Sequence, residues 1–363
     1  MIVTSLTLRN FRNYERLCIH PDPGMNLILG NNAQGKTNLL ESLVYLSLTR
    51  SHRIQDDTAL IKDGASFADA ACVFEQDGLR REIEAVIYPK GKTLLVQKQP
   101  VRKSSEFIGL LNVVLFAPDD LTLFSDQPKD RRRIMDQELS RVSPKYLYSS
   151  TRYRAALRER NALLKEERVE PALLETMDEQ MIALQKEIIS MRREFVAFLD
   201  SHITGMYRNL SDDTAEVRVF YRCCVDPEQD PDEALRNMYR DNLEKDMRYH
   251  TTTVGVQRED LLFTIYGGNV IQRASQGQKR MIMMAFKLAL MKFIEEKTKQ
   301  RPVLLLDDVL SELDPCRAAK LLSIVSSPYQ CLITSASVPS FFEVRNVRTF
   351  YIENGNMKEA QGV

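Results

Sequence analysis

Alternating and continuous runs of apolar residues predict strands near both ends of the chain. Residues 2–9 alternate, with Ile2, Leu6 and Leu8 on one face, which suits a β-strand better than a helix. Residues 25–29, 112–116 and 302–308 are instead nearly continuous apolar runs, typical of strands buried on both faces. Further strand-like segments are expected at residues 70–74, 82–88, 93–96, 261–266, 270–272, 330–335 and 350–352. We therefore predict an antiparallel sheet beside a mainly parallel layer.

The middle third of the chain has a helical pattern instead. Apolar residues recur at alternating spacings of three and four, which favours a coiled-coil-like seam. They are Leu174, Met177, Met181, Leu184, Ile188, Met191, Phe195 and Phe198, with a weaker partner stripe at Tyr146, Ser150, Tyr153, Leu157 and Leu164. Pro171, between the two stripes, suits a first helical turn. We expect an antiparallel helical hairpin with arms of about 35–40 Å at about 1.5 Å per residue, although a compact helical subdomain would bury the same stripes.

These patterns divide the chain into three segments. Residues 1–125 and 250–363 carry the strand-rich patterns, and residues 126–249 carry the helical insertion. Charge is unevenly distributed within the insertion. Residues 128–168 hold twelve Lys or Arg and six Asp or Glu, whereas residues 226–246 hold three Lys or Arg and eight Asp or Glu. We therefore predict an α/β head, assembled from both ends of the chain, with an inserted helical arm.

Composition narrows the class of protein. The 363 residues are 44% apolar and 28% charged, an ordinary globular composition. Lys plus Arg and Asp plus Glu each number 50, so a nucleic-acid surface must be a local patch. We expect reduced thiols in a cytoplasmic protein outside the membrane, because the six cysteines lack C-x-x-C spacing and neither a signal peptide nor a bilayer-length apolar run is present. The four histidines show no metal-ligand spacing.

A glycine-rich loop between the apolar strand at residues 25–29 and a helical pattern is the strongest chemical signal. Its residues are Gly30, Asn31, Asn32, Ala33, Gln34, Gly35, Lys36 and Thr37. This G-x-x-x-x-G-K-T spacing is typical of a P-loop, whose backbone N–H groups and following helix N-terminus bind phosphates. Lys36 would reach the β- and γ-phosphates of ATP, and the Thr37 hydroxyl would bind Mg²⁺.

Two later segments extend this prediction. Asp307 and Asp308 end an apolar strand, where ligands of parallel sheets bind, although a strand-end cap would explain them too. The segment Ser275-Gln276-Gly277-Gln278 precedes a long helical pattern and is compatible with a simple N-cap. Arg131, Arg132 and Arg133 form a basic run that is either a DNA contact or a solvated or internally paired helix face.

The order of these motifs resembles ABC-type ATPases of the SMC-like branch and, within that branch, the RecF family of recombination and replication-repair proteins. The resemblance extends over the whole chain. It rests on residues 10–14, 51–53, 109–116, 131–133, 275–278 and 304–314. One departure is Glu259, which stands in a Gln-Arg-Glu-Asp segment where a His-Arg-Asp-Asp version is expected.

The resemblance implies roles for individual residues. Asp307 would hold Mg²⁺ through water beside Thr37, and Asp308 would orient or deprotonate the attacking water. Ser275, Gly277 and Gln278 would form a signature that reaches the γ-phosphate held by another subunit. Residues 311–314 would contact the opposite site, and Arg12 and Asn13 would lie near the adenine.

The resulting functional hypothesis is an ATP-switched DNA-binding protein that acts in recombinational repair, replication restart and the SOS response. It would bind single-stranded, duplex, gapped or junction DNA, hydrolyse ATP slowly with DNA stimulation, form an ATP-dependent homodimer and assist recombinase loading with RecO- and RecR-type mediators. The alternative is the ATPase subunit of an ABC-type membrane transporter; Thr334 and Ser335 stand where transporters usually have a histidine. A P-loop kinase would leave residues 275–280 unexplained.

Overall fold

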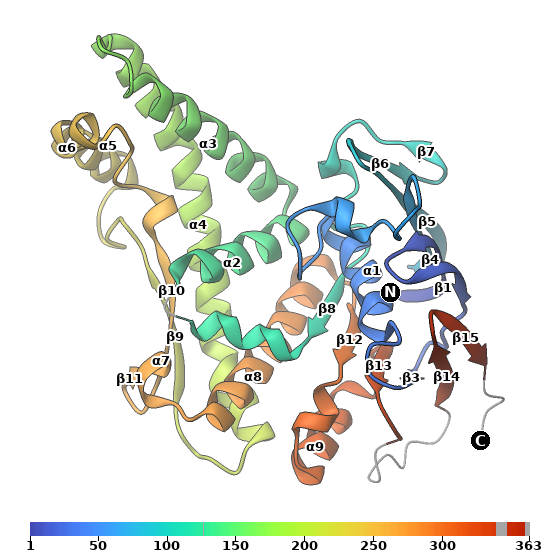
Figure 1. The fold of residues 1–363 in the computed structure, drawn as a ribbon. Coiled ribbons are helices and arrows are strands. Elements are labelled where there is room, and N and C mark those ends of the chain that lie inside the picture. The colour runs from blue at the N-terminus through green and yellow to red at the C-terminus, as the bar shows by residue number, and fades with distance from the viewer. Residues whose placement is uncertain (126, 339–346, 360–363) are drawn as a thin grey trace. The chain divides into compact units, whose positions relative to one another are not determined.

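A computed structural model describes residues 1–125, 127–338 and 347–359 (Figure 1). Its contacts divide the chain into two compact units, which are described separately. The first unit comprises residues 1–121, 205–214 and 280–363, and the second comprises residues 122–204 and 215–279.

A six-stranded, mainly parallel sheet carries the P-loop strand in the first unit. Its order is β15 (Asn356–Glu359), β14 (Arg348–Glu353), β3 (Met25–Leu29), β13 (Cys331–Ser335), β12 (Val303–Asp307) and β8 (Val113–Phe116). Only the β14–β15 pair is antiparallel. β3, β8, β12 and β13 are buried at every position, as the continuous apolar runs predicted.

An antiparallel sheet forms the other layer of the first unit. Its order is β2 (Tyr14–Ile19), β1 (Ile2–Phe11), β4 (Ala68–Gln76), β5 (Leu79–Tyr88), β6 (Gly91–Val96) and β7 (Gln99–Pro100). The exposure of β4 alternates along the strand, so one face of this sheet packs inward. The predicted fold class, a mixed α/β head with an antiparallel sheet beside the P-loop layer, is confirmed.

Helix α1 (Lys36–Leu48) lies in the shared core of these two sheets. It contacts β4 and β5 of the antiparallel sheet and β8, β12 and β13 of the parallel sheet. One continuous apolar cluster joins the three elements and includes Leu8, Leu39, Leu43, Phe74, Leu305 and Leu332. The helix that begins at the P-loop lysine is therefore held on both sides by packed apolar residues, which gives the loop a rigid support.

The remaining helical elements that lie wholly within the first unit are short. They are η1 (Asp57–Leu60), η2 (Ser104–Glu106), η5 (Val309–Glu312) and α9 (Pro315–Val325). Two more, η3 (Pro118–Phe124) and α8 (Gln276–Thr298), have ends in different units. Within the described residues, no helix is both long enough and apolar enough to cross a membrane.

The second unit is built on helices. They are α2 (Pro128–Val142), α3 (Pro144–Leu163), α4 (Pro171–Leu210, whose last residues belong to the first unit), α5 (Pro231–Asp241) and α6 (Leu243–Tyr249). α3 and α4 are antiparallel. Lys145, near the start of α3, pairs with Glu187, whereas Arg160, near its end, pairs with Asp178, which lies earlier in α4. The predicted hairpin and the first-turn position of Pro171 are confirmed.

The predicted arm lengths were wrong. α3 has 20 residues and α4 has 40, about 30 Å and 60 Å at about 1.5 Å per residue. α4 is longer because its apolar pattern continues beyond Phe198, where Leu199, Ile203 and Tyr207 are also buried. The two helices therefore pair over only part of α4.

A three-stranded antiparallel sheet completes the second unit, with η4 (Val256–Arg258) just before it. Its order is β11 (Gly268–Asn269), β10 (Asp260–Ile265) and β9 (Val217–Arg222). The positive φ values at Tyr266 and Gly267 are typical of a type I′ turn between β10 and β11. The predicted strand at residues 270–272 is instead helix α7 (Val270–Arg273), because the Asn269 side chain caps it by accepting the Ile271 N–H.

The same three-stranded sheet places the end of the inserted segment near residue 279. The sequence pattern suggested a return to the head near residue 250. β10 instead pairs with β9 along its whole length, so residues 250–279 belong to the second unit. The Ser275 segment is therefore part of that unit.

The three consecutive arginines at residues 131–133 have unequal environments. Arg131 is buried and forms a bidentate ion pair with Asp260, at 2.8 Å for both nitrogen–oxygen distances. Arg132 donates to the carbonyl oxygen of Glu259 at 2.9 Å. Arg133 is exposed and pairs with Asp130. The predicted DNA contact is therefore corrected for Arg131, whose guanidinium anchors α2 to β10 and is not available to a phosphate.

Arg131→Ala should lower the free energy of unfolding by about 3–5 kcal/mol, because it leaves the buried Asp260 carboxylate without its main partner. Arg133→Ala is the matched control and should change stability by less than about 0.5 kcal/mol. Urea denaturation followed by circular dichroism measures both. Equal stability of the two variants would contradict the anchoring role.

Candidate nucleotide-binding site

Two glycines let the P-loop backbone approach its neighbours closely. A Cβ on Gly30 would lie 2.3 Å from the carbonyl oxygen of Ile352. A Cβ on Gly35, whose φ is +112°, would lie 2.5 Å from Nδ2 of Asn13. Larger residues therefore do not fit without displacement of the neighbouring β14 strand or the β1–β2 turn.

Side chains from that β1–β2 turn hold the loop in place. Asn13 Nδ2 donates to the carbonyl oxygen of Gln34 at 2.9 Å. The Tyr14 hydroxyl donates to the carbonyl oxygen of Gly35 at 2.8 Å. Asn31, Asn32 and Ala33, at the tip, are exposed. The base of the loop is thus fixed while its tip remains accessible to a ligand.

Lys36 lies within the curve of the loop. Its Nζ donates to the carbonyl oxygens of Gly30 at 2.6 Å and Asn31 at 2.9 Å, and the residue is buried. Burial lowers the pKa of Lys36, and the carboxylates of Asp308 and Asp307 oppose that effect. An ammonium group flanked by exposed loop backbone is well placed to meet an anion.

A hydrogen-bonded cluster connects the P-loop helix to the end of β12. The Thr37 hydroxyl donates to Asp307 Oδ1 at 2.9 Å, and the Thr334 hydroxyl donates to the same oxygen at 2.8 Å. The backbone N–H of Asp308 donates to the Thr334 hydroxyl at 2.9 Å. Burial raises the pKa of Asp307, opposed mainly by the hydrogen bonds from Thr334 and Thr37. A hydroxyl and a buried carboxylate in contact are the oxygen donors that Mg²⁺ prefers.

The backbone of Asp308 lies in the left-handed region. Its φ is +52°, a backbone conformation that residues other than glycine rarely adopt. Its Oδ1 is buried and accepts no hydrogen bond from the described residues. An unpaired buried carboxylate oxygen next to Asp307 fits a role toward a cation or a water molecule at this strand end.

Arg12 stabilises the base of the site from the side. Its Nε and NH2 atoms donate to the two carboxylate oxygens of Glu41 at 2.9 Å and 2.8 Å. Glu41 is fully buried in α1, and Ser51 also donates to it. Although burial raises the pKa of Glu41, the hydrogen bonds from Arg12 and Ser51 outweigh it and leave the pKa below its usual value. The structure gives Arg12 a structural partner, and its contact with adenine stays a prediction.

Ser275 and Gln278, in the second unit, form a capping box at the start of α8. The Gln278 N–H donates to the Ser275 hydroxyl at 3.2 Å, and the Ser275 N–H donates to Gln278 Oε1 at 3.0 Å. Ser275, Gln276 and Gly277 are exposed. The N-cap interpretation is confirmed, and it leaves the exposed helix N-terminus free to face an anion.

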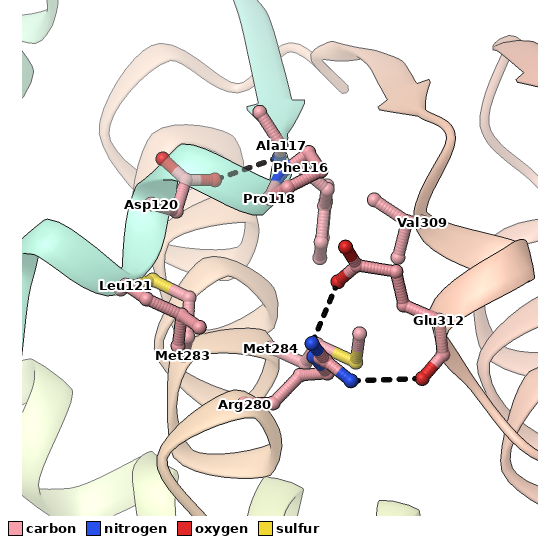
Figure 2. Close-up of a pocket in the computed structure, with 10 residues that line it drawn as sticks. All are labelled: Phe116, Ala117, Pro118, Asp120, Leu121, Arg280, Met283, Met284, Val309 and Glu312. Atoms are coloured by element: carbon pink, nitrogen blue, oxygen red, sulfur yellow. Dashed lines mark hydrogen bonds and ion pairs between the residues drawn. The ribbon is translucent and has the colours of Figure 1, made fainter. Parts of the chain in front are cut away.

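A small pocket in the first unit lies between the end of β8, helix α8 and residues 309–312 (Figure 2). Phe116, Met283, Met284 and Val309 are among its apolar lining residues. At its edge, Arg280 donates to the carbonyl oxygen of Glu312 at 2.9 Å and forms an ion pair with its carboxylate at 3.0 Å. None of the P-loop residues lines this pocket, so it is not the phosphate site. The contacts between Arg280 and Glu312 hold residues 309–312 against α8.

The structure thus brings the P-loop, Asn13, Asp307 and Asp308 together within the first unit, whereas the Ser275 segment belongs to the second. Sequence reasoning did not assign Thr334 to this site. The available signals were a polar residue at the end of the apolar run 330–335, at the same sheet edge as Asp307, and its place where transporters usually have a histidine.

Comparisons with known proteins extend over almost the whole chain. The family described as RecF/RecN/SMC N terminal domain matches residues 2–358. The DNA replication and repair protein RecF of Lactobacillus johnsonii is 35% identical over 370 residues, covering 98% of this chain and 99% of the relative. A solved structure of the recombination mediator protein RecF-ATP in the RecFOR pathway is 30% identical, with a TM-score of 0.92 and coverage of 99% of this chain and 98% of that one.

More distant structures share the fold alone. An Smc head domain from Pyrococcus furiosus is 18% identical, with a TM-score of 0.58 and coverage of 99% of this chain and 96% of that one. The family match over residues 2–358 and the relatives at 30% and 35% identity indicate the same family. The chain therefore belongs to the RecF family, within the RecF/RecN/SMC N-terminal domain group.

Proposed function

We propose that this chain is an ATP-switched DNA-binding protein of recombinational repair and replication restart. The observation that carries the proposal is the contact of the Thr37 hydroxyl with Asp307, which joins the P-loop to the carboxylates at the end of β12. The names of its relatives, DNA replication and repair proteins, support the same activity. Membership of this family sets the transporter alternative aside.

In the proposed complex with ATP, the backbone and the side chains of the P-loop have different roles. The backbone N–H groups of residues 30–37 surround the phosphates, while Lys36 neutralises charge on the β- and γ-phosphates. Thr37 and Asp307 would hold Mg²⁺, with Asp307 acting through water. A related solved structure is that of a RecF-ATP protein, which supports ATP as the ligand.

Hydrolysis in this proposal depends on Asp308 and is slow. Its carboxylate orients or deprotonates the attacking water, and Mg²⁺ supplies charge stabilisation. Asp is one methylene shorter than the Glu that most ABC-type sites carry, so the carboxylate reaches the water less well. We expect turnover below about 1 per second, at the low end of ordinary enzymes. Slow turnover suits a protein whose bound ATP acts as a timer.

The γ-phosphate site is completed by a second copy of the chain. The P-loop tip is exposed in the first unit, and the capped N-terminus of α8 is exposed in the second. A two-fold arrangement lets each Ser275 segment face the γ-phosphate held by its partner. ADP lacks that phosphate, so only ATP favours the dimer.

The solvent-exposed face of α3 is the best candidate for phosphate contacts with DNA. Lys145, Arg152, Arg154 and Arg158 are exposed there, and Glu159 is the only acidic residue of the helix. Lys145 pairs with Glu187, and Arg154 lies 4.0 Å from Asp136. Arg152 stacks on the exposed Tyr148 ring. Among the described residues, neither Arg152 nor Arg158 has a carboxylate within ion-pair distance.

Partner proteins and location complete the proposal. The RecF-ATP structure belongs to a protein of the RecFOR pathway, which supports RecO- and RecR-type mediators as partners in recombinase loading and the SOS response. The proposed location is the cytoplasm, where single-stranded, gapped or duplex DNA is available.

Lys36→Ala should weaken ATP binding by at least about tenfold and leave the fold intact. Each charge-assisted hydrogen bond that is lost contributes about 1.5–3 kcal/mol. Isothermal titration with ATP and Mg²⁺ measures the affinity, and circular dichroism checks the fold. Lys98→Ala, at an exposed turn, is the control. Unchanged ATP affinity in the Lys36 variant would rule out the P-loop assignment.

Ser275→Asp should bind ATP yet remain monomeric, whereas Ser275→Asn should still dimerise. Both residues are good N-caps, so the two variants differ mainly in a negative charge that repels the partner's γ-phosphate. Sedimentation velocity with ATP or ADP measures the oligomeric state. ATP-dependent dimers of the Asp variant would remove Ser275 from the intersubunit site and leave the P-loop assignment intact.

Arg152→Ala combined with Arg158→Ala should weaken duplex DNA binding and flatten its salt dependence. Two lost phosphate contacts should reduce the log–log slope by about 1.8. Arg240→Ala, which removes an exposed arginine from an acidic segment, is the control. Fluorescence anisotropy at several salt concentrations gives the slope. If the slope is the same as in the wild type, α3 is not the DNA surface.

A further inference from the structure

A cluster of two cysteines and a glutamate lies in the second unit, outside the proposed nucleotide and DNA sites. Cys223 and Cys224 follow the end of β9, and Glu259 precedes the start of β10. The pairing of Arg222 with Asp260 brings these two strand ends together (Figure 1). The three side chains offer ligand atoms within 4.8 Å of one another.

A bend in the chain turns both thiols toward the same oxygen. Successive side chains of an extended strand point to opposite faces, so adjacent cysteines in a strand do not converge. β9 ends at Arg222, the Cys223 N–H donates to the carbonyl oxygen of Tyr221 at 3.0 Å, and the chain bends at Cys224. The Cys223 and Cys224 sulfurs consequently lie 3.3 Å and 3.2 Å from Glu259 Oε1.

We propose that Cys223, Cys224 and Glu259 bind one thiophilic divalent cation, with Zn²⁺ as the best match. Zn²⁺ binds sulfur at about 2.3 Å and carboxylate oxygen at about 2.0–2.2 Å, so tetrahedral ligands place sulfur and oxygen about 3.5 Å apart. The observed separations are shorter by only a few tenths of an ångström. The cation replaces the two thiol protons that now point at Glu259.

The surrounding groups already orient these ligands. Arg192 NH1 donates to Glu259 Oε2 at 2.7 Å, and the Tyr221 hydroxyl donates to the same oxygen, so Oε1 faces the thiols. Second partners of this kind fix the direction of a metal-binding carboxylate. The Val225 N–H lies 3.5 Å from the Cys223 sulfur, and Arg193 NH2 lies 3.7 Å from it. N–H groups directed at a sulfur stabilise its thiolate form.

Charge and access are also compatible with a dication. Two thiolates and a carboxylate carry three negative charges. The dication and the neighbouring guanidinium groups of Arg192, which also pairs with Asp136, and Arg193 offset that charge. Glu259 is buried, whereas both cysteines are partly exposed, so the fourth position is open to water. A bound cation would fix the segment after β9 to the start of β10. This site is independent of the proposed ATP and DNA activities.

Titration of the untagged, fully reduced protein with Co²⁺ tests the proposal, because Co²⁺ occupies Zn²⁺ sites and shows a thiolate charge-transfer absorption. One equivalent of Co²⁺ should produce the absorption in the wild type, and Zn²⁺ should displace it, since Zn²⁺ binds such sites more tightly. Cys223→Ser and Cys224→Ser should each lose the absorption or weaken Co²⁺ binding at least tenfold. The controls Cys18→Ser and Cys316→Ser, at exposed cysteines, should behave as the wild type.

Three results would each overturn the proposal. One is a wild-type protein without thiolate charge transfer at several equivalents of Co²⁺. Another is a Cys223→Ser, Cys224→Ser double variant that retains the absorption. Loss of the absorption in a control variant would have the same consequence. Serine leaves the hydrogen bond of the residue 224 N–H to Glu259 possible, so these variants should fold, and circular dichroism checks that they do. Glu259→Gln is less suitable because it disturbs the buried pair with Arg192.

Discussion

The hydrogen bond from the Thr37 hydroxyl to the Asp307 carboxylate is the contact on which the nucleotide site depends. It joins the first turn of α1 to the end of β12, residues that are 270 positions apart in the sequence. Thr334 binds the same carboxylate oxygen from β13, so three elements meet at one buried atom. Because α1 is packed between two sheets, this contact holds the loop and the carboxylates in one rigid arrangement. Preorganised charge of this kind is what phosphate chemistry requires of a protein.

Much of this site could be predicted because its signals are local. The P-loop needs glycines at two positions, and Gly30 and Gly35 are the positions where a Cβ would strike a neighbour. Asp307 follows an apolar run whose length and composition mark a buried strand. Thr334 could not be found in this way, since a lone threonine at a strand end is common. Its role arises only from the parallel pairing of β12 with β13.

The second unit shows where sequence reasoning is limited. Arg131 and Arg133 are two residues apart, but a helix turns them to different sides, so one is buried against Asp260 and the other is exposed. Residues 270–272 have a strand-like composition, and the cap from Asn269 overrides it. Cys223 and Cys224 lack the spacing of a metal motif, and only the bend after β9 and the pairing with β10 make them neighbours of Glu259. Tertiary contacts decide the burial of Arg131 and the approach of the two cysteines to Glu259, whereas the cap of α7 is a local hydrogen bond that composition does not reveal.

The central claim is that nucleotide state controls DNA binding. Its most direct test is the affinity of the wild-type protein for labelled duplex DNA, measured by fluorescence anisotropy at one salt concentration with Mg²⁺ and ATP, ADP or no nucleotide. A coupling of about 1.4 kcal/mol or more predicts DNA binding at least about tenfold tighter with ATP than with ADP. Equal affinities in all three conditions would contradict the account, because ATP would then have no differential effect on the DNA-binding state.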